Sequence, residues 1–262
     1  MYNARFALDR YNGEMKITPL KTHRITEKDK NLFSIFDKYL PKLSEKSVVA
    51  VSSKIIAVTQ GRVEKDNSLE NKNRLIEKEA DFFLSPSGSK YHVYLTIKEN
   101  ILIPSAGIDE SNADHKLVLW PENLQETVNK MRHYLQKRFN LKKIGLIIVD
   151  SKVTPLRWGA IGFCLAHSGF LGVKNLIGQK DLFDKSFVYT KENIRDGLAA
   201  AAAVTMGEGT EQTPLALIEE LPFVEFQERN PSLEELTDLS INREDDLYAP
   251  LLNSVNWMSK KN

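Results

Sequence analysis

The sequence predicts an α+β protein (mixed α/β), in which helices pack against a mixed sheet. Segments whose apolar residues recur at helical spacing alternate with short, β-branched apolar runs along the chain. The two kinds of segment interleave irregularly, without an internal repeat or a low-complexity linker. This irregular order favours a mixed sheet over a repeating architecture. The length of 262 residues allows one large domain or two small ones.

In the first half of the chain, apolar spacing and breaking residues delimit the elements. Apolar residues recur at helical spacing from residue 31 to residue 43, which predicts a helix whose extent Pro41 limits. The next run is β-branched, and the polar Ser52-Ser53-Lys54 step either divides it into two strand pieces or lies within one long strand that Gly61 ends. The predicted elements are a helix at 31–43, strand structure at 47–60, a surface helix at 71–83, and two strands at 90–96 and 99–104.

The second half contains the clearest helix and the most apolar strand. Pro121 suits the first turn of a helix, and an apolar stripe follows it on one face. A compact apolar run ends on Asp150, which predicts a buried strand with a carboxylate at its tip. Consecutive alanines at 199–203 predict a tightly packed helix. The predicted elements are a helix at 121–139, a strand at 143–150, a strand or buried loop at 159–169, a helix at 190–206, a strand at 214–221 and a helical tail at 231–262.

Composition excludes several classes of protein. Lys and Arg total 36 against 35 Asp and Glu, so the net charge of +1 argues against broad binding to nucleic acid or to an anionic membrane. The single cysteine, Cys164, excludes a disulfide framework and a Cys-rich zinc site. No apolar run approaches the roughly 18 residues of a membrane helix, and Met1–Lys16 lacks the apolar centre of a secretory signal. We therefore expect a cytoplasmic protein with no nucleic-acid or membrane partner.

Acidic residues at strand ends are the strongest candidates for chemistry. Asp109 lies in the polar segment 105–112, and Asp150 is followed directly by Ser151. Two carboxylates with hydroxyl and amide oxygens beside them could form the hard, oxygen-lined site that Mg²⁺ or Mn²⁺ prefers. The alternative is that both acids are ordinary turn residues. The histidines show no metal-ligand spacing, and no standard phosphate-loop motif is present.

Other polar residues have both a functional and a structural interpretation. The glycine-rich segment 206–214 could place backbone amides against a nucleotide, or it could simply be a helix C-cap. Lys54 could reach a phosphate, or it could extend from a strand edge. Arg62 could clamp a phosphate or carboxylate, or it could pair with a nearby acid. Cys164 is interpreted as a packed residue, and His167 as a satisfied structural histidine or a pocket residue.

Several of these segments occur in an order that resembles a known family. They are Ser53-Lys54 with Gly61-Arg62, Ala106-Gly107-Ile108-Asp109-Glu110-Ser111-Asn112, Asp150-Ser151, Asp196-Gly197-Leu198 before the alanines, and Met206-Gly207. From about residue 17 to 222, the chain resembles the coenzyme F(420) gamma-glutamyl ligase family (CofE-like). The resemblance implies a CofE-like ligase fold with a core at 1–222, arranged as one body or as two intertwined subdomains. A C-terminal tail at 223–262 would pack on this core.

The resemblance also implies an activity. Members of the family are GTP- and metal-dependent ligases that join L-glutamate to the lactyl carboxylate of a deazaflavin precursor and then add a further glutamate by a gamma linkage. An acyl phosphate formed with GTP or ATP would activate the acceptor carboxylate. The implied cofactors are Mg²⁺ or Mn²⁺, with K⁺ as a further candidate, and the implied assembly is a homodimer.

Matching the family motifs position by position implies roles for individual residues. The implied catalytic residues are Asp109, Asp150 and Arg157. The implied metal ligands are Asp109, Asp150, Ser151 and Glu208. The implied nucleotide-binding residues are Ser53, Lys54, Asn112, Met206, Gly207, Glu208 and Gly209.

Positions on the substrate side depart from the family pattern. Val153-Thr154 stands where the family has Gly-Arg, and the segment near the family's Gly-x-Pro is Thr22-His23-Arg24-Ile25. Val58 replaces a family Lys, and Gln60 replaces a Glu. An Arg that binds phosphate or carboxylate is not replaced neutrally by Thr. Three functions therefore stay open: ligation of glutamate to the deazaflavin precursor, ligation to a folate-like pterin without a phosphodiester, and nucleotide or metal binding without ligase activity.

Overall fold

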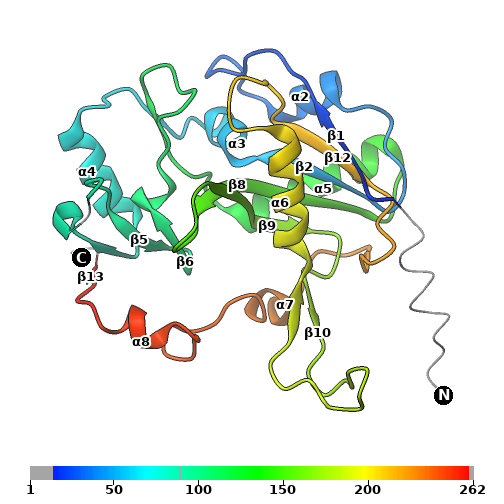
Figure 1. Ribbon diagram of the computed structural model, residues 1–262. Helices are drawn as coiled ribbons and strands as arrows, with labels where there is room; N and C mark the ends of the chain where they lie inside the picture. Colours follow the sequence, from blue (N-terminus) through cyan, green and yellow to red (C-terminus); the bar gives the residue numbers. More distant parts are fainter. Residues whose placement is uncertain (1–13, 89, 260–262) are drawn as a thin grey trace.

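A computed structural model describes residues 14–88 and 90–259, and it confirms the mixed α+β class (Figure 1). Its main sheet has five strands in the order β1, β12, β2, β8, β9. β2 and β8 are parallel neighbours, and the other pairings are antiparallel. The strands are β1 at Lys16–Leu20, β2 at Ser47–Ser52, β8 at Ile144–Val153, β9 at Ala160–Ser168 and β12 at Leu215–Glu219.

Helices cover both faces of the main sheet because successive strand residues point to opposite sides. Val49 and Ile148 belong to the cluster under α2, α3 and α5, whereas Val48 and Ile147 belong to the cluster under α6. Burial on both faces explains why β2 and β8 are continuously apolar. Figure 1 shows α6 lying across one face of the sheet. The helices are α2 at Leu32–Tyr39, α3 at Ser53–Gln60, α5 at Leu124–Phe139 and α6 at Ile194–Met206.

The alanine-rich helix α6 lies close to β9, as its small residues predict. Gly162 of β9 has no room for a side chain, because a Cβ there would lie 2.4 Å from the Ala203 Cβ and 2.6 Å from the Ala199 carbonyl oxygen. Cys164 is buried in the same apolar cluster, and burial raises the pKa of its thiol to about 12. The interpretation of Cys164 as a packed residue is confirmed.

A second, smaller sheet is formed mostly by residues between α3 and α5, and it has an apolar cluster of its own. Its strand order is β13, β4, β5, β6, with antiparallel pairing throughout. β3 and β7 pair separately. The elements are β3 at Val63–Glu64, α4 at Leu69–Glu79, β4 at Phe82–Leu84, β5 at Leu95–Lys98, β6 at Ile101–Pro104 and β7 at Leu117–Val118, with 3-10 turns at Pro86–Gly88 and Ser105–Gly107.

A partly buried ion-pair network joins this second sheet to Arg62, which follows the C-cap of α3. Arg62 and Lys98 bind the carboxylate of Glu79 at 2.8 Å and 2.6 Å. Burial raises the pKa of Glu79, but the two cations outweigh burial and hold it below its usual value. Of the two alternatives for Arg62, pairing with a nearby acid is therefore the one that the structure shows.

Residues 53–60 form a helix, so the prediction of strand structure over all of 47–60 was wrong. β2 ends at Ser52, and α3 begins at the next residue. Ile55 and Ile56 are buried in the main core, and this packing outweighs the strand preference of β-branched residues. Gly61, with φ of 75°, supplies the left-handed residue that ends the helix. Lys54 therefore lies in the first turn of a helix and not at a strand edge.

Asp150 does not end its strand, contrary to the prediction. β8 continues to Val153 because it pairs with β9 along this whole stretch. The neighbouring strand β2 does end here, since its last residue, Ser52, lies opposite Val149. Asp150 is thus the first residue of β8 beyond the parallel pair, beside the start of α3.

Other predicted boundaries shift by a few residues. α5 begins at Leu124, so Pro121 precedes the helix and does not form its first turn. The turn between β5 and β6 falls at Glu99 and Asn100, which both have positive φ, so these two strands lie later than predicted. Of the two alternatives for 159–169, the strand is confirmed by β9.

The C-terminal segment is only partly helical, so the prediction of a helical tail at 231–262 was wrong in part. The short helices α7 at Leu233–Thr237 and α8 at Ala249–Leu252 precede β13 at Met258–Ser259, which pairs with β4. Figure 1 shows this segment passing from the main sheet to the second sheet. A ribbon of β10 at Val173–Asn175 and β11 at Lys191–Asn193 extends away from the body. The division of the chain at residue 222 stays a prediction.

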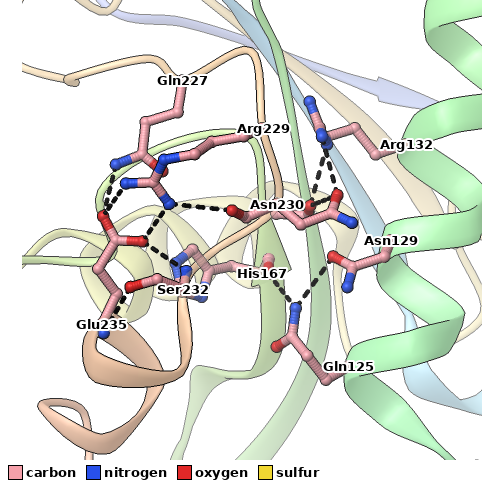
Figure 2. Close-up of polar contacts among 10 residues, drawn as sticks. Gln125, Asn129, Arg132, His167, Gln227, Arg229, Asn230, Ser232 and Glu235 are labelled. Atoms are coloured by element: carbon pink, nitrogen blue, oxygen red, sulfur yellow. Dashed lines mark hydrogen bonds and ion pairs between the residues drawn. The ribbon is translucent and has the colours of Figure 1, made fainter.

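A polar network joins the start of this tail to α5 and β9 (Figure 2). Arg132 is buried, and it donates to Ser168 Oγ at 2.9 Å and to Asn230 Oδ1 at 2.8 Å. Glu235 binds Arg229 at 2.7 Å and 2.8 Å, and this pairing lowers the pKa of Glu235 to about 2. The network fixes the chain that follows β12 onto the body.

No helix within 14–88 and 90–259 is long and apolar enough to cross a membrane. The prediction about a secretory signal concerns Met1–Lys16, of which residues 1–13 lie outside the described residues.

Candidate functional site

A cleft of about 740 Å³ lies between the main sheet, the segment after β6 and the loop after α6. All but one of the residues to which the family motifs assign roles line this cleft, although they come from segments far apart in the chain. Arg157 is the exception. The residues that line it are Ser53, Lys54, Asp109, Asn112, Asp150, Ser151, Met206, Gly207, Glu208 and Gly209.

Lys54 connects α3 to the segment after β6. Its Nζ lies 2.6 Å from Asp109 Oδ2 and donates to the Ser111 carbonyl oxygen at 2.7 Å. The Ser111 N–H donates to Asp109 Oδ1 at 2.7 Å. Burial raises the pKa of Asp109, but the Lys54 ammonium and the Ser111 donors outweigh burial and leave that pKa below its ordinary value. Asp109 is therefore a carboxylate at neutral pH with a cation bound to it.

Asp150 has the opposite electrostatic environment. Its Oδ1 accepts the Ser151 N–H at 2.8 Å. Burial and, to a smaller extent, the nearby negative charge of Asp109 raise the pKa of Asp150, whereas the neighbouring donor groups of Ser151, Trp120 and Ser53 lower it, and together they bring this pKa to about 6. The cleft thus holds two carboxyl groups that affect each other, one ionised and one that titrates close to neutral pH.

The loop after α6 forms another wall of the cleft. Gly207, with φ of 79°, closes the last turn of α6, which confirms that this glycine is a helix cap. The same loop reaches both carboxylate segments, because Ser151 Oγ donates to Glu208 Oε2 at 3.2 Å and Asn112 Nδ2 donates to the Gly209 carbonyl oxygen at 2.9 Å. Capping the helix and lining the cleft are therefore compatible for this segment.

A further segment, 22–28, also lines the cleft. Arg24 lies 3.5 Å from Asp114, and Glu27 forms an ion pair with Lys116. Sequence reasoning identified 22–25 only as a departure from the family pattern. Nothing in the local sequence indicates these partners, because they are about 90 residues away along the chain.

Trp120 is a cleft residue that sequence reasoning missed. It is 2% exposed, and its indole N–H is buried without a hydrogen-bond partner in the part of the chain that the structure describes. Gly107 makes room for it, because a Cβ at this position would lie 2.1 Å from the indole nitrogen. The glycine was part of a motif, but no pattern named the ring that it accommodates.

Arg157 lies in the exposed turn between β8 and β9. Its backbone N–H donates to the Thr154 carbonyl oxygen at 3.4 Å. Its neighbours Leu156 and Trp158 are almost fully exposed. Within one chain, the structure does not bring Arg157 together with the other residues of the predicted site.

The cleft supplies the kind of oxygen atoms that Mg²⁺ and Mn²⁺ prefer. Asp109 and Asp150 are near enough to affect each other, and Ser151 contacts Glu208 beside them. Among the described residues, however, no group of three His, Cys, Asp or Glu side chains is arranged to hold a metal ion. The donor set fits a hard cation by its chemistry, and Lys54 would have to release Asp109 for both carboxylates to bind one.

His167 lies outside the cleft, in the core between β9 and the tail. It is 1% exposed, and burial lowers its pKa to about 4. Its Nδ1 has no hydrogen-bond partner among the described residues. The interpretation of His167 as a structural residue is thus confirmed, whereas the expectation that its polar atoms are satisfied was wrong for Nδ1.

The chain is similar in sequence to known ligases. Residues 19–220 match the family model F420-0:Gamma-glutamyl ligase. The chain is 28% identical over 212 residues to a coenzyme F420:L-glutamate ligase from Methanococcus maripaludis, which covers 75% of this chain and 84% of the relative. A protein of the same name from Methanosarcina barkeri is 31% identical over 191 residues, 68% of this chain and 74% of the relative. A third, from Methanocaldococcus jannaschii, is 35% identical over 129 residues, 49% of this chain and 51% of the relative.

Proposed function

Because the chain belongs to the F420-0:gamma-glutamyl ligase family, we propose that it joins L-glutamate to a carboxylate acceptor by an amide bond, with GTP or ATP as co-substrate. Relatives are named coenzyme F420:L-glutamate ligase. The observation that supports this proposal is the convergence of Lys54, Asp109 and Asp150 in one cleft. A cation, two carboxylates and a glycine-rich loop are the parts that phosphoryl transfer needs.

The proposed reaction has two steps. An oxygen of the acceptor carboxylate first attacks the terminal phosphorus of the nucleotide, and the bond to the bridging oxygen breaks to give an acyl phosphate and a nucleoside diphosphate. The amine of L-glutamate then attacks the acyl carbon, the amide bond forms, and phosphate and the amine proton leave. Both steps depend on positioning and on neutralised charge. Neither step needs a thiol, which is compatible with the burial of Cys164.

The residues of the cleft have distinct tasks in this proposal. Lys54 places a positive charge on the nucleotide phosphates, and the backbone of loop 206–213 supplies N–H donors to them. Ser53 and Asn112 contact the nucleotide. The residues that would hold Mg²⁺ or Mn²⁺, with K⁺ as a further candidate, are Asp109, Asp150, Ser151 and Glu208. Such an ion supplies charge neutralisation at the transferred phosphoryl group.

The proposed acceptor is the lactyl carboxylate of a deazaflavin precursor. A folate-like pterin is the second candidate, and the residue that favours it is Thr154, which stands where the family pattern has Arg. An acceptor without a phosphodiester does not need that cation. We further propose that the protein works as a homodimer.

A ligation assay tests the activity and distinguishes the acceptors. The full chain is supplied with GTP or ATP, Mn²⁺ or Mg²⁺, L-glutamate and one acceptor at a time, and the products are weighed by mass spectrometry. We expect a glutamyl adduct of the deazaflavin precursor, and an adduct formed only on the pterin would support the second candidate. Asp109→Asn should abolish product formation, whereas Asp114→Asn, at the exposed mouth of the cleft, is the matched control. Nucleotide binding without any product would support a non-catalytic module, and absence of nucleotide binding would rule out both ligase functions.

A further inference from the structure

Trp120 carries a buried hydrogen-bond donor that lacks a partner within residues 14–88 and 90–259. Its side chain is 2% exposed, and its Nε1 is buried and unbonded. An unpaired buried donor costs about 1–3 kcal/mol, and such groups are rare enough in native proteins to require an explanation. Trp120 lines the cleft, so an acceptor for this donor is to be sought among the other residues that line it.

The indole ring cannot turn this donor elsewhere. Gly107 lies so close that a Cβ there would be 2.1 Å from Nε1. Lys98 Nζ lies 5.3 Å from the centre of the ring, and the ring of Phe163 lies 6.3 Å away at 49°. Arg62 Nε also donates to the Trp120 carbonyl oxygen at 3.1 Å. The position of the ring is therefore fixed by packing on several sides.

Asp150 lines the same cleft as this donor and packs beside the same ring. Phe163, which packs against the indole, is the cross-strand partner of Asp150. Within the described residues, the Asp150 carboxylate has one hydrogen bond of normal length, from the Ser151 N–H to Oδ1. Trp120 is also among the donor groups that lower the pKa of Asp150, in agreement with this packing. Ser53 is a further donor group beside this carboxylate, and no hydrogen bond to Oδ2 is present among the described residues.

We propose that Trp120 is a positioning residue whose indole N–H bonds Asp150 Oδ2 and fixes the carboxylate toward the cleft. The role rests on the proposed function, in which Asp150 binds the divalent cation. With the Ser151 N–H on one oxygen and the Trp120 N–H on the other, each oxygen keeps a lone pair for a cation in the cleft that Asp150 lines. A ligand oriented in this way by a fixed donor binds its cation more tightly than a free one.

The hydrogen bond itself is tested by NMR of the indole groups. The chain has three tryptophans, so a ¹⁵N–¹H spectrum of indole-labelled protein contains three signals, which single Trp→Phe variants assign. We expect Asp150→Asn to shift the Trp120 indole proton upfield, because a bond to a charged acceptor is lost, while the Trp158 and Trp257 signals stay in place. An unmoved Trp120 signal in folded Asp150→Asn would overturn the proposal.

The positioning role is tested by Mn²⁺ binding alone, followed by electron paramagnetic resonance. Trp120→Phe keeps a ring but removes the donor, and we expect it to weaken Mn²⁺ binding by roughly tenfold or more. Trp257→Phe, whose indole N–H bonds the Leu252 carbonyl oxygen in the tail, is the matched control and should bind as the unmodified protein does. A tryptophan analogue in which benzothiophene replaces indole removes the N–H and preserves the shape of the ring. It is incorporated at position 120 in a chain with Trp158→Phe and Trp257→Phe, so that no other tryptophan is replaced. Unchanged binding in both Trp120 variants would show that the indole N–H does not position Asp150.

These two measurements separate the inference from the proposed function. If the unmodified protein binds no Mn²⁺, the metal part of the proposed function is wrong, and the positioning role that rests on it is overturned with it. The NMR experiment then still decides whether the indole–carboxylate bond exists. If Mn²⁺ binds but no ligation product forms, the positioning role is still decided by the Trp120 variants.

Discussion

At the scale of single residues, the cleft gives two chemically identical side chains different properties. Lys54 lies 2.6 Å from Asp109 and keeps its pKa low, whereas burial raises the pKa of Asp150 to about 6. Asp109 carries its own counter-ion, and Asp150 has none within residues 14–88 and 90–259. A bound cation would therefore benefit Asp150 most, because it would compensate a charge that the protein leaves uncompensated.

The first prediction concerns the stability of the protein against pH. The folded-state pKa of Asp150 lies above the ordinary value of 3.8. The unfolded chain therefore loses this proton at lower pH than the folded chain does. As a result, the free energy of unfolding decreases as the pH rises from about 4 to about 6, and it remains at the lower value at higher pH. We expect Asp150→Asn to raise the free energy of unfolding at pH 7 by up to about 3 kcal/mol in the presence of a chelator, and to change little below pH 4. Urea unfolding at several pH values measures this, and an Asn variant less stable than the unmodified protein at pH 7 would contradict it.

The second prediction concerns Lys54. Its ammonium is the cation nearest to Asp109, and in the proposed function it transfers its charge to the nucleotide phosphates. Lys54→Gln should weaken GTP or ATP binding by at least tenfold in a fluorescence titration with a labelled nucleotide. Lys78→Gln, on the exposed side of α4, is the matched control. Equal affinities of the two variants would remove Lys54 from the nucleotide site.

At the scale of elements, the segment that follows β12 is held by a buried guanidinium. Arg132 of α5 binds Ser168 of β9 and Asn230 of the tail, and its described partners are neutral acceptors (Figure 2). Burial lowers the pKa of Arg132. Because a buried donor left without partners is costly, the three elements depend on one another through this single side chain.

Replacing Arg132 should therefore destabilise the protein more than replacing an exposed arginine of the same network. We expect Arg132→Ala to lower the free energy of unfolding by about 2–4 kcal/mol, because it leaves a cavity and unpaired acceptors. Arg229→Ala, which removes an exposed ion pair with Glu235, should cost about 1 kcal/mol or less. Chemical denaturation of both variants gives the comparison, and similar losses would show that Arg132 is not the anchor.

Much of the fold and of the site could be predicted from sequence at this scale, where neighbouring residues act together. The buried strand before Asp150, the helix with Met131 and Leu135 on one stripe, and the packed alanines all follow from local patterns. α3 could not be predicted in this way, because Ile55 and Ile56 form a helix only through tertiary packing. The same holds for Trp120, since its role depends on Gly107 and Asp150, which approach it only in the folded chain.

At the scale of the whole molecule, apolar side chains are concentrated at the tip of the β8–β9 hairpin, away from the cores. Leu156 and Trp158 are almost fully exposed there, and Val153 and Ile161 are about half exposed. Exposed apolar patches of this kind mark interaction surfaces in soluble proteins. Arg157 lies among them, outside the cleft of its own chain.

The proposed homodimer should depend on this hairpin tip. We expect the unmodified protein to have the mass of two chains in light scattering, and the double variant Leu156→Ser, Trp158→Ser to shift toward the mass of one chain. Leu233→Ser, which changes an exposed leucine of α7, is the control and should remain a dimer. A dimer that survives the double variant would place the contact on another surface.

The strand order of the main sheet also sets the order in which the protein can be built during synthesis. β12 lies between β1 and β2, so the central sheet cannot be completed until residue 219 has left the ribosome. The strands β4, β5 and β6 lie close together in sequence and can pair long before that point. Until then the nascent chain exposes the edge of β2 that β12 later covers, so the synthesis of β12 ends the exposure of this apolar strand to aggregation.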